Sequence, residues 1–353
     1  MKTATFALLF ALCLSASCPQ KQPPLPARST AAAAPVPVFG PKMNGLTFVA
    51  PPEPFPENPM PPIREVGANW IAVVPYAFTP PGKPEVRYSP QGGHWWGERP
   101  EGVRETVRLA HASGLKVMLK PQVWIPGGWV GALDFAAPED WAKWEAGYEK
   151  YILSMAQLAD SLQVDLFCIG TEFNVSLAKR PQFWDDLISK IRATYRGKLT
   201  YSANWDDWAR VPFWSKLDFV GLGGYFPLVD APTPSIEQLT AAWQPIRDSL
   251  AVFSQKQGKP ILFTEYGYLS VDGCGWRNWE LENGIESRPI NQQAQANCLE
   301  ALHRVFQKEQ WWAGGFLWKW FPNMRGHEGY PERDYTPQGK LGENVLKRVM
   351  NDK

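Results

Sequence analysis

Short apolar segments alternate with helical segments along this chain, and this alternation restricts the folds open to it. Each apolar segment is too short for a helix and reads as a buried strand. The segments cover residues 45–49, 69–75, 116–120, 164–169, 199–203, 219–223, 261–263 and 315–320. Strands that alternate with helices favour a parallel sheet, and eight such units predict a single closed α/β barrel, the (β/α)8 or TIM barrel.

The helical segments carry apolar residues at steps of three and four, which is the spacing of one helix face. They cover residues 102–113, 138–162, 181–195, 290–308 and 341–350, with a short helix expected near residues 211–216. Another helix should begin at Ser235, because Ser235 and Gln238 have the spacing of a capping box.

An open, doubly wound sheet is the alternative arrangement of the same elements. That fold usually places a glycine-rich turn after its first strand, where it binds a phosphate group. Here the first predicted strand is followed by APPEPF, which contains prolines and no glycine. The sequence therefore favours the barrel and argues against nucleotide binding.

The N-terminus has the features of an export signal over residues 1–17: the charged Lys2, an apolar run and three small residues. Cys18 follows directly, and LSASC resembles a loose lipoprotein box in which Cys18 is lipidated; ordinary secretory cleavage nearby is the alternative. Residues 18–38 are rich in proline and alanine and predict a disordered tether. We therefore expect a barrel domain at 39–353 that is extracytoplasmic, either lipid-anchored at the bacterial cell envelope or secreted.

Charge and composition exclude several kinds of partner. The net charge is +1 and there is no basic block, which argues against nucleic-acid binding. The four histidines are scattered and form no zinc-binding pattern with cysteines, so we expect no metal site, and no cofactor is implied. Cys168 reads as a core residue, whereas Cys274 and Cys298 could form a disulfide that the sequence alone does not decide.

Two glutamates follow predicted strands. Glu172 comes just after the strand at 164–169, and Glu265 just after the strand at 261–263. Barrel enzymes keep their catalytic groups at these strand ends. Breaking a glycosidic bond needs one carboxylic acid and one carboxylate, which different environments can supply. Two unrelated surface charges are the alternative interpretation.

Tryptophan is unusually frequent, with 18 residues, and many of them fall in predicted loops. Exposed aromatic faces suit the apolar C–H faces of sugar rings, although part of this set should serve the core. Those that follow predicted strands include Trp124, Trp129, Trp205, Trp276 and Trp318. An aromatic groove around two carboxylates predicts a glycan hydrolase.

Five segments together resemble glycoside hydrolase family 113, a clan A family of retaining enzymes that act on β-mannans. The segments are IGTEF (169–173), SANWD (202–206), GLGGYFPL (221–228), FTEYGY (263–268) and FLWKW (316–320). The resemblance covers roughly residues 38–350. It implies that Glu172 is the acid/base, Glu265 the nucleophile, Tyr225 a partner of the nucleophile and Trp318 the floor under the reacting sugar.

Four further residues are candidates for substrate binding. Most of the clan has asparagine where this chain has Thr171, which leaves open the group that binds the sugar 2-hydroxyl. Asn204 is our candidate, and a loop-capping amide is the alternative. Trp205 and Trp276 follow other predicted strands, and Lys120 and Trp124 could line the groove after the third strand, although Lys120 could equally be an ion-pair partner.

We therefore expect a retaining hydrolase of β-1,4-mannosidic linkages in mannan, glucomannan or manno-oligosaccharides. Its partner would be a polysaccharide or oligosaccharide, and it would meet a membrane only through an N-terminal lipid. Three alternatives remain: a hydrolase of another β-glycan, including an exo-acting one; a non-catalytic glycan-binding surface lipoprotein; and a structural envelope protein.

Overall fold

The computed structural model describes residues 37–352, apart from residue 90 and residues 324–329. The predicted signal peptide at 1–17, the predicted lipidation site Cys18 and nearly all of the predicted tether at 18–38 lie outside the described residues.

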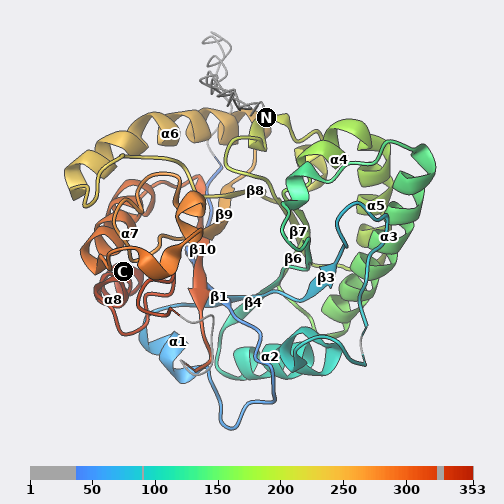
Figure 1. The fold of residues 1–353 in the computed structure, drawn as a ribbon, viewed down its shortest axis with the longest axis horizontal. Coiled ribbons are helices and arrows are strands. Elements are labelled where there is room, and N and C mark those ends of the chain that lie inside the picture. The colour runs from blue at the N-terminus through green and yellow to red at the C-terminus, as the bar shows by residue number, and fades with distance from the viewer. Residues whose placement is uncertain (1–36, 90, 324–329, 353) are drawn as a thin grey trace, which may run out of the picture. The chain divides into compact units, whose positions relative to one another are not determined.

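The predicted barrel is confirmed. Its strands are β1 (Met43–Phe48), β2 (Trp70–Val73), β4 (Lys116–Leu119), β6 (Leu166–Thr171), β7 (Lys198–Ser202), β8 (Val220–Gly223), β9 (Ile261–Tyr266) and β10 (Trp312–Trp320). They pair in parallel in the order β7-β6-β4-β2-β1-β10-β9-β8. A parallel bridge between Ala203 and Leu222 joins β7 to β8 and closes the ring. Figure 1 looks into this ring, with helices around it.

A second, two-stranded parallel sheet continues the chain beyond two barrel strands. It consists of β3 (Tyr76–Phe78) and β5 (Gln122–Trp124), which follow β2 and β4 within a few residues. The sequence did not predict these strands separately. Trp124 is the last residue of β5, and Trp129 lies in the loop that follows it.

The main predicted helices are present. They are α2 (Pro100–Ala112), α3 (Pro138–Ser161), α5 (Pro181–Thr194), α6 (Ile236–Gln257), α7 (Gln292–Phe306) and α8 (Leu341–Asn351). Two short helices, α1 (Pro61–Glu65) and α4 (Asn174–Lys179), were not predicted. The predicted short helix near 211–216 is the 3-10 turn η4 (Trp214–Lys216). The capping box at the start of α6 is present: Ser235 Oγ accepts from the Gln238 N–H, and Gln238 Oε1 accepts from the Ser235 N–H.

The core has two parts, because strand residues point alternately inward and outward. A smaller buried cluster takes residues such as Trp70, Met118, Leu166 and Phe316 from alternate strand positions and fills the barrel. Gly45 leaves room for one of them, since a Cβ at Gly45 would lie 2.3 Å from the Phe316 ring. A larger cluster packs between the strands and the helices and contains three tryptophans without solvent exposure, Trp144, Trp184 and Trp243. Part of the tryptophan excess is therefore structural.

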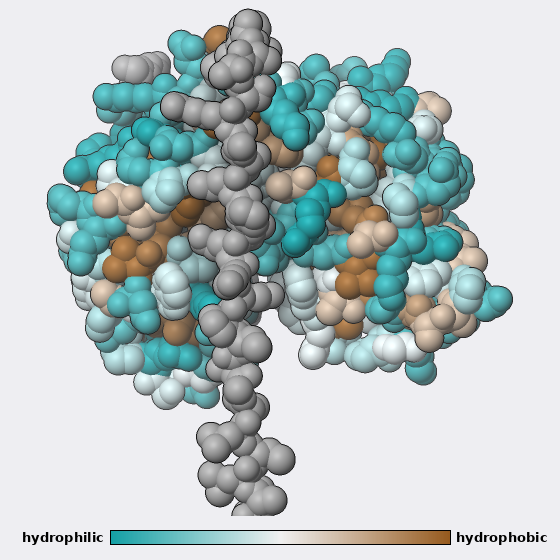
Figure 2. Space-filling model, turned by 90° about the horizontal axis from the view of Figure 1, so that it is seen from above, coloured by the Kyte–Doolittle hydropathy of each residue, from teal (hydrophilic) through white to brown (hydrophobic). Residues whose placement is uncertain are grey.

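The surface view in Figure 2 shows a face on which hydrophilic residues predominate, with apolar residues in small groups between them. Among the helices that the structure describes, none combines the length and the apolar character that a membrane crossing needs.

Candidate active site

Glu172 is the first residue after β6, and its backbone is unusual. Its φ angle of +56° lies in the left-handed region, which is uncommon for a residue with a side chain. The Glu172 N–H donates to the carbonyl oxygen of Ser202 at the end of β7, with a distance of 2.8 Å. Strained backbone of this kind clusters at functional sites.

β6, which Glu172 follows, and β9, which contains Glu265, each have an extra residue relative to a neighbouring strand. Along β6, Cys168 pairs with Thr200 and Thr171 pairs with Ser202, so three steps on β6 match two on β7. Along β9, Phe263 pairs with Leu222 but Glu265 pairs with the next residue of β8, Gly223. Such bulges re-aim side chains and are frequent next to active sites. In β9 the bulge turns Glu265 toward the barrel interior, where simple alternation would point it outward with Phe263.

Three donors converge on the Glu265 carboxylate. Lys120 Nζ forms an ion pair with Oε1, and Gln122 Nε2 donates to the same oxygen at 2.7 Å. The Tyr225 hydroxyl donates to Oε2 at 3.2 Å. The Lys120 side chain has no solvent exposure and that of Glu265 is 14% exposed. A buried positive charge and two neutral donors therefore hold this carboxylate in one orientation.

Glu172 has a different environment. Its Oε2 accepts a hydrogen bond from the indole Nε1 of Trp129 at 2.7 Å. The pKa of Glu172 is raised to about 7 by burial first and then by the negative charges of Glu265 and Asp206, against the lowering effects of the Trp129 bond and the Lys120 charge. Near neutral pH a substantial fraction of Glu172 is protonated beside an ion-paired Glu265. This is the division into acid and carboxylate that glycoside cleavage requires.

The structure brings three of the predicted binding residues to Glu265. Lys120 and Tyr225 bond to it directly. The Trp318 ring lies beside this group, because Lys120 Nζ is 5.6 Å from its centroid. Trp318 lies in β10 and is only partly buried.

Of the other predicted binding residues, Asn204 and Trp205 follow β7, Trp276 follows β9, and Trp124 is the last residue of β5. Asn204 donates from Nδ2 to Asp206 Oδ1 at 2.9 Å, and Asp206 acts electrostatically on Glu172. The Trp205 ring stacks on Trp279, with centroids 5.7 Å apart.

Trp124, at the end of β5, is 54% exposed. The Trp276 ring lies 5.8 Å from the Arg277 guanidinium. Within the described part of the chain, no hydrogen bond joins Trp124 or Trp276 to either glutamate.

Two hydrogen bonds of the glutamates were not predicted from the sequence: Gln122 to Glu265, and Trp129 to Glu172. Gln122 was not predicted, although it is two residues beyond Lys120 in an extended segment, where side chains at this spacing share a side. Trp129 was counted among the aromatic residues of the groove, but its bond to Glu172 was not foreseen. The conformation of the loop after β5 decides that bond, and no local sequence pattern signals it.

Among the described residues, the cysteines form no disulfide and no side-chain cluster could hold a metal ion. Cys168, Cys274 and Cys298 are free and buried in this structure. The Cys274 and Cys298 thiols are hydrogen-bonded neighbours, and burial holds the pKa of Cys298 well above its usual range. In the described ranges, no group of three or more histidine, cysteine, aspartate or glutamate side chains is placed to hold a metal ion.

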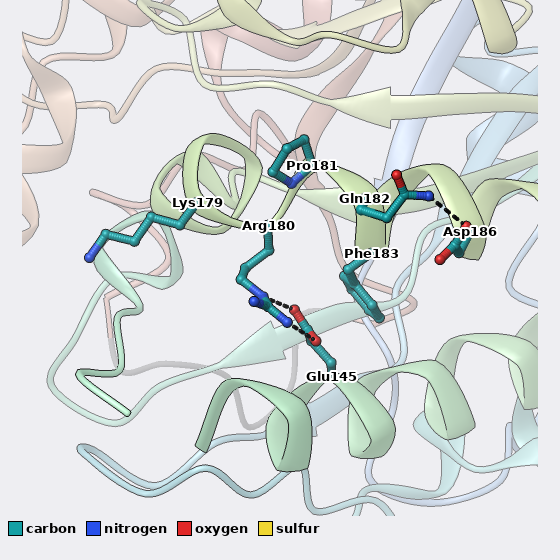
Figure 3. Close-up of a pocket in the computed structure, with 7 residues that line it drawn as sticks. All are labelled: Glu145, Lys179, Arg180, Pro181, Gln182, Phe183 and Asp186. Atoms are coloured by element: carbon teal, nitrogen blue, oxygen red, sulfur yellow. Dashed lines mark hydrogen bonds and ion pairs between the residues drawn. The ribbon is translucent and has the colours of Figure 1, made fainter. Parts of the chain in front are cut away.

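Another pocket, of about 310 Å³, lies on the outside of the barrel between α3, α4 and α5 (Figure 3). Arg180 makes two hydrogen bonds to Glu145 there, of 2.6 and 2.9 Å, and Gln182 donates to Asp186 at 2.9 Å. These polar groups are hydrogen-bonded to one another, and neither Glu172 nor Glu265 lines the pocket. We therefore place the site at the barrel mouth and not in this pocket.

Comparisons with known proteins agree with this geometry. The model of Glycoside Hydrolase Family 113 matches residues 55–340. A structure described as a complex of a GH113 beta-1,4-mannanase is 25% identical, covers 89% of this chain and 100% of its own, and has a TM-score of 0.74. The GH113 beta-mannanase AaManA from Alicyclobacillus acidocaldarius, in complex with ManMIm, is 25% identical over 88% of this chain and 97% of its own, with a TM-score of 0.73.

A more distant similarity supports the fold alone. Fungal beta-1,4-galactanase is 15% identical, covers 81% of this chain and 89% of its own, and has a TM-score of 0.53. No curated protein matches the sequence.

Proposed function

Because this chain belongs to glycoside hydrolase family 113, we propose that it hydrolyses β-1,4-mannosidic linkages of mannan, glucomannan or manno-oligosaccharides with retention of configuration. One observation carries the proposal: two glutamates at the ends of different strands lie within electrostatic reach of each other, one with a pKa raised to about 7 and one paired with a lysine. The two mannanase structures named above support the choice of substrate.

The first step would form a glycosyl–enzyme ester. The Glu172 carboxylic acid gives its proton to the glycosidic oxygen as the bond from that oxygen to the anomeric carbon breaks, and the bonding electrons stay on the oxygen. The Glu265 carboxylate attacks the anomeric carbon from the opposite side. In the second step Glu172, now a carboxylate, takes a proton from water while the water oxygen displaces Glu265. Two inversions give net retention.

The neighbours of Glu265 suit a nucleophile. Lys120 and Gln122 hold Oε1, and Tyr225 holds Oε2, so the attacking carboxylate is oriented before substrate arrives. Such orientation removes part of the entropic barrier to the reaction. Trp318, beside this group, would lie under the sugar that reacts.

The proposal also places the enzyme outside the cytoplasm. The export-signal features of residues 1–17, Cys18 and the tether composition of residues 18–38 support an enzyme outside the cytoplasm, held by a lipid or secreted. Polymeric mannan would be accessible there.

A panel assay tests the function. Release of reducing ends is measured on galactomannan, glucomannan, manno-oligosaccharides, cellulose, xylan and chitosan, with the wild type, Glu172→Gln and Glu265→Gln. Glu65→Gln, which alters an exposed glutamate of α1, is the matched control. Activity on mannans that only the two site variants lose supports the proposal. Preference for another polymer refutes the substrate, and glycan binding without turnover refutes hydrolysis.

A further inference from the structure

We propose that Trp129 positions the carboxyl group of Glu172 and that its exposed face binds the sugar that departs with the leaving oxygen. This inference rests on the proposed hydrolase function and adds to it a positioning residue and a defined sugar-binding surface.

The contact between Trp129 and Glu172 is direct. The indole N–H donates to Glu172 Oε2 at 2.7 Å, which is at the short end of the range for N–H···O hydrogen bonds. On the backbone side, the bond from the Glu172 N–H to Ser202 fixes the main chain of the same residue. The Glu172 carbonyl oxygen also accepts from the Asn174 N–H at 2.9 Å, so two hydrogen bonds hold the main chain, and Trp129 supplies the described hydrogen bond on the carboxyl group.

The loop is shaped to place the Trp129 ring. Trp129 immediately precedes the 3-10 turn η2 (Val130–Ala132). A Cβ at Gly131 would lie 2.3 Å from Cζ2 of the Trp129 ring, so the ring lies directly against the Gly131 backbone. The φ angle of Gly131 is not in the left-handed region, so this glycine is needed for space and not for its backbone conformation. Any side chain at this position would push the ring out of place.

The exposed surface of Trp129 lies where a leaving sugar must lie. Trp129 remains 46% exposed although its ring edge contacts Glu172. As the proton donor, Glu172 must approach the glycosidic oxygen to hydrogen-bond distance. That oxygen belongs to the departing sugar, whose ring is then a few ångströms from Glu172. An indole face beside Glu172 offers an apolar surface to the C–H face of that sugar, and contact with aromatic faces is a major source of binding energy.

Several charged and titratable groups also face Glu172. They are Glu265 of β9, Lys120 after β4 and Asp206 in the loop after β7, together with the hydroxyls of Tyr201 and Tyr225. Among the causes that act on the pKa of Glu172, Trp129 is the one that acts through a side-chain hydrogen bond. This bond lowers the pKa, so its removal should raise it. A sugar that covers Trp129 would also exclude water from the hydrogen bond between Trp129 and Glu172. Sugar binding would thereby strengthen the bond that orients the proton donor.

The test compares Trp129→Phe, Trp129→Ala and Gly131→Ala with Trp95→Phe as a control. Trp95 is exposed to a similar extent, 45%, and takes no part in the described hydrogen bonds of Glu172. The first readout is the titration of Glu172 without substrate, followed by NMR of carboxyl-labelled glutamate and assigned with Glu172→Gln. The second is kcat and KM on manno-oligosaccharides, and kcat/KM on an aryl mannoside whose good leaving group needs no proton and carries no leaving sugar.

The expected results differ between variants. Trp129→Phe keeps an aromatic face but loses the N–H, so the Glu172 titration and the basic limb of kcat move to higher pH, kcat falls about tenfold and KM stays near the wild type. Trp129→Ala also raises KM for manno-oligosaccharides. Gly131→Ala shifts the titration in the same direction although the indole is intact. Activity on the aryl mannoside falls much less in all three, and Trp95→Phe leaves the Glu172 titration unchanged.

An unchanged titration in Trp129→Phe would overturn the positioning role. An unchanged KM for manno-oligosaccharides in Trp129→Ala would overturn the sugar-binding surface. If the wild type turns over no glycan, the proposed function fails and the sugar-binding surface fails with it, whereas the titration still decides whether Trp129 holds Glu172.

Discussion

Replacing Lys120 with methionine should both destabilise the barrel and suppress activity. Lys120 is fully buried and its partner Glu265 is 14% exposed. Methionine has a similar length and leaves no large cavity, so the main loss is the positive charge. Glu265 would then keep a negative charge in a buried site with only Gln122 and Tyr225 as donors.

The magnitude follows from the burial of the pair. Removing one partner of a buried ion pair leaves an uncompensated charge and typically costs about 3–5 kcal/mol, whereas replacing both partners by neutral groups is often close to neutral. We therefore expect Lys120→Met to lower the free energy of unfolding by about 3 kcal/mol or more at pH 7. Lys120→Met/Glu265→Gln should be more stable than Lys120→Met alone.

Urea unfolding of the wild type, both single variants and the double variant measures the coupling between the two residues. Strongly non-additive free energies, with the double variant recovering most of the loss, would support a buried ion pair that holds Glu265. Additive effects, or a loss below about 1 kcal/mol in Lys120→Met, would refute this reasoning, since exposed pairs contribute that little.

Three further predictions concern other residues. Burial raises the pKa of Glu98 from 4.5 to about 7, so its contribution to stability is present at pH 4 and is lost as the pH rises through 7. In urea unfolding, the free energy of unfolding of the wild type should fall by about 2–3 kcal/mol between pH 5 and pH 8 because of this group, and Glu98→Gln should abolish that fall. Equal pH slopes in both proteins would contradict this. Ser235→Ala should lower the free energy of unfolding by about 1 kcal/mol through loss of the capping box of α6, and an unchanged urea midpoint would argue against it. Glu172→Gln should lower kcat/KM on manno-oligosaccharides by about 10²–10⁴-fold and far less on an aryl mannoside with a good leaving group, so equal losses on both substrates would exclude Glu172 as the acid.

The barrel could be predicted because its pattern is local. Each strand is a short apolar run, and amphipathic helices separate most of them, so the order of elements alone selects a closed parallel sheet. The positions of Glu172 and Glu265 at strand ends were visible for the same reason. The helix α4, only six residues long, and the paired strands β3 and β5 were not visible, because such short elements depend on tertiary contacts.

The fine geometry of the site could not be predicted from local pattern. The bulges in β6 and β9 depend on the register with neighbouring strands, and a shift of one residue reverses the side to which a side chain points. Strict alternation would have turned Glu265 away from Lys120. The bond from Trp129 to Glu172 likewise depends on the fold of a loop around Gly131, which the sequence does not show.

The central claim is that Glu265 becomes covalently bound to the sugar while Glu172 moves the proton. Trapping with a 2-deoxy-2-fluoro-mannoside that carries a good leaving group, followed by mass spectrometry of the digested protein, tests it directly. We predict one added fluorosugar on the peptide that contains Glu265, and none in Glu265→Gln. Label on another residue, or no label on an enzyme that the same reagent inactivates, would contradict the account.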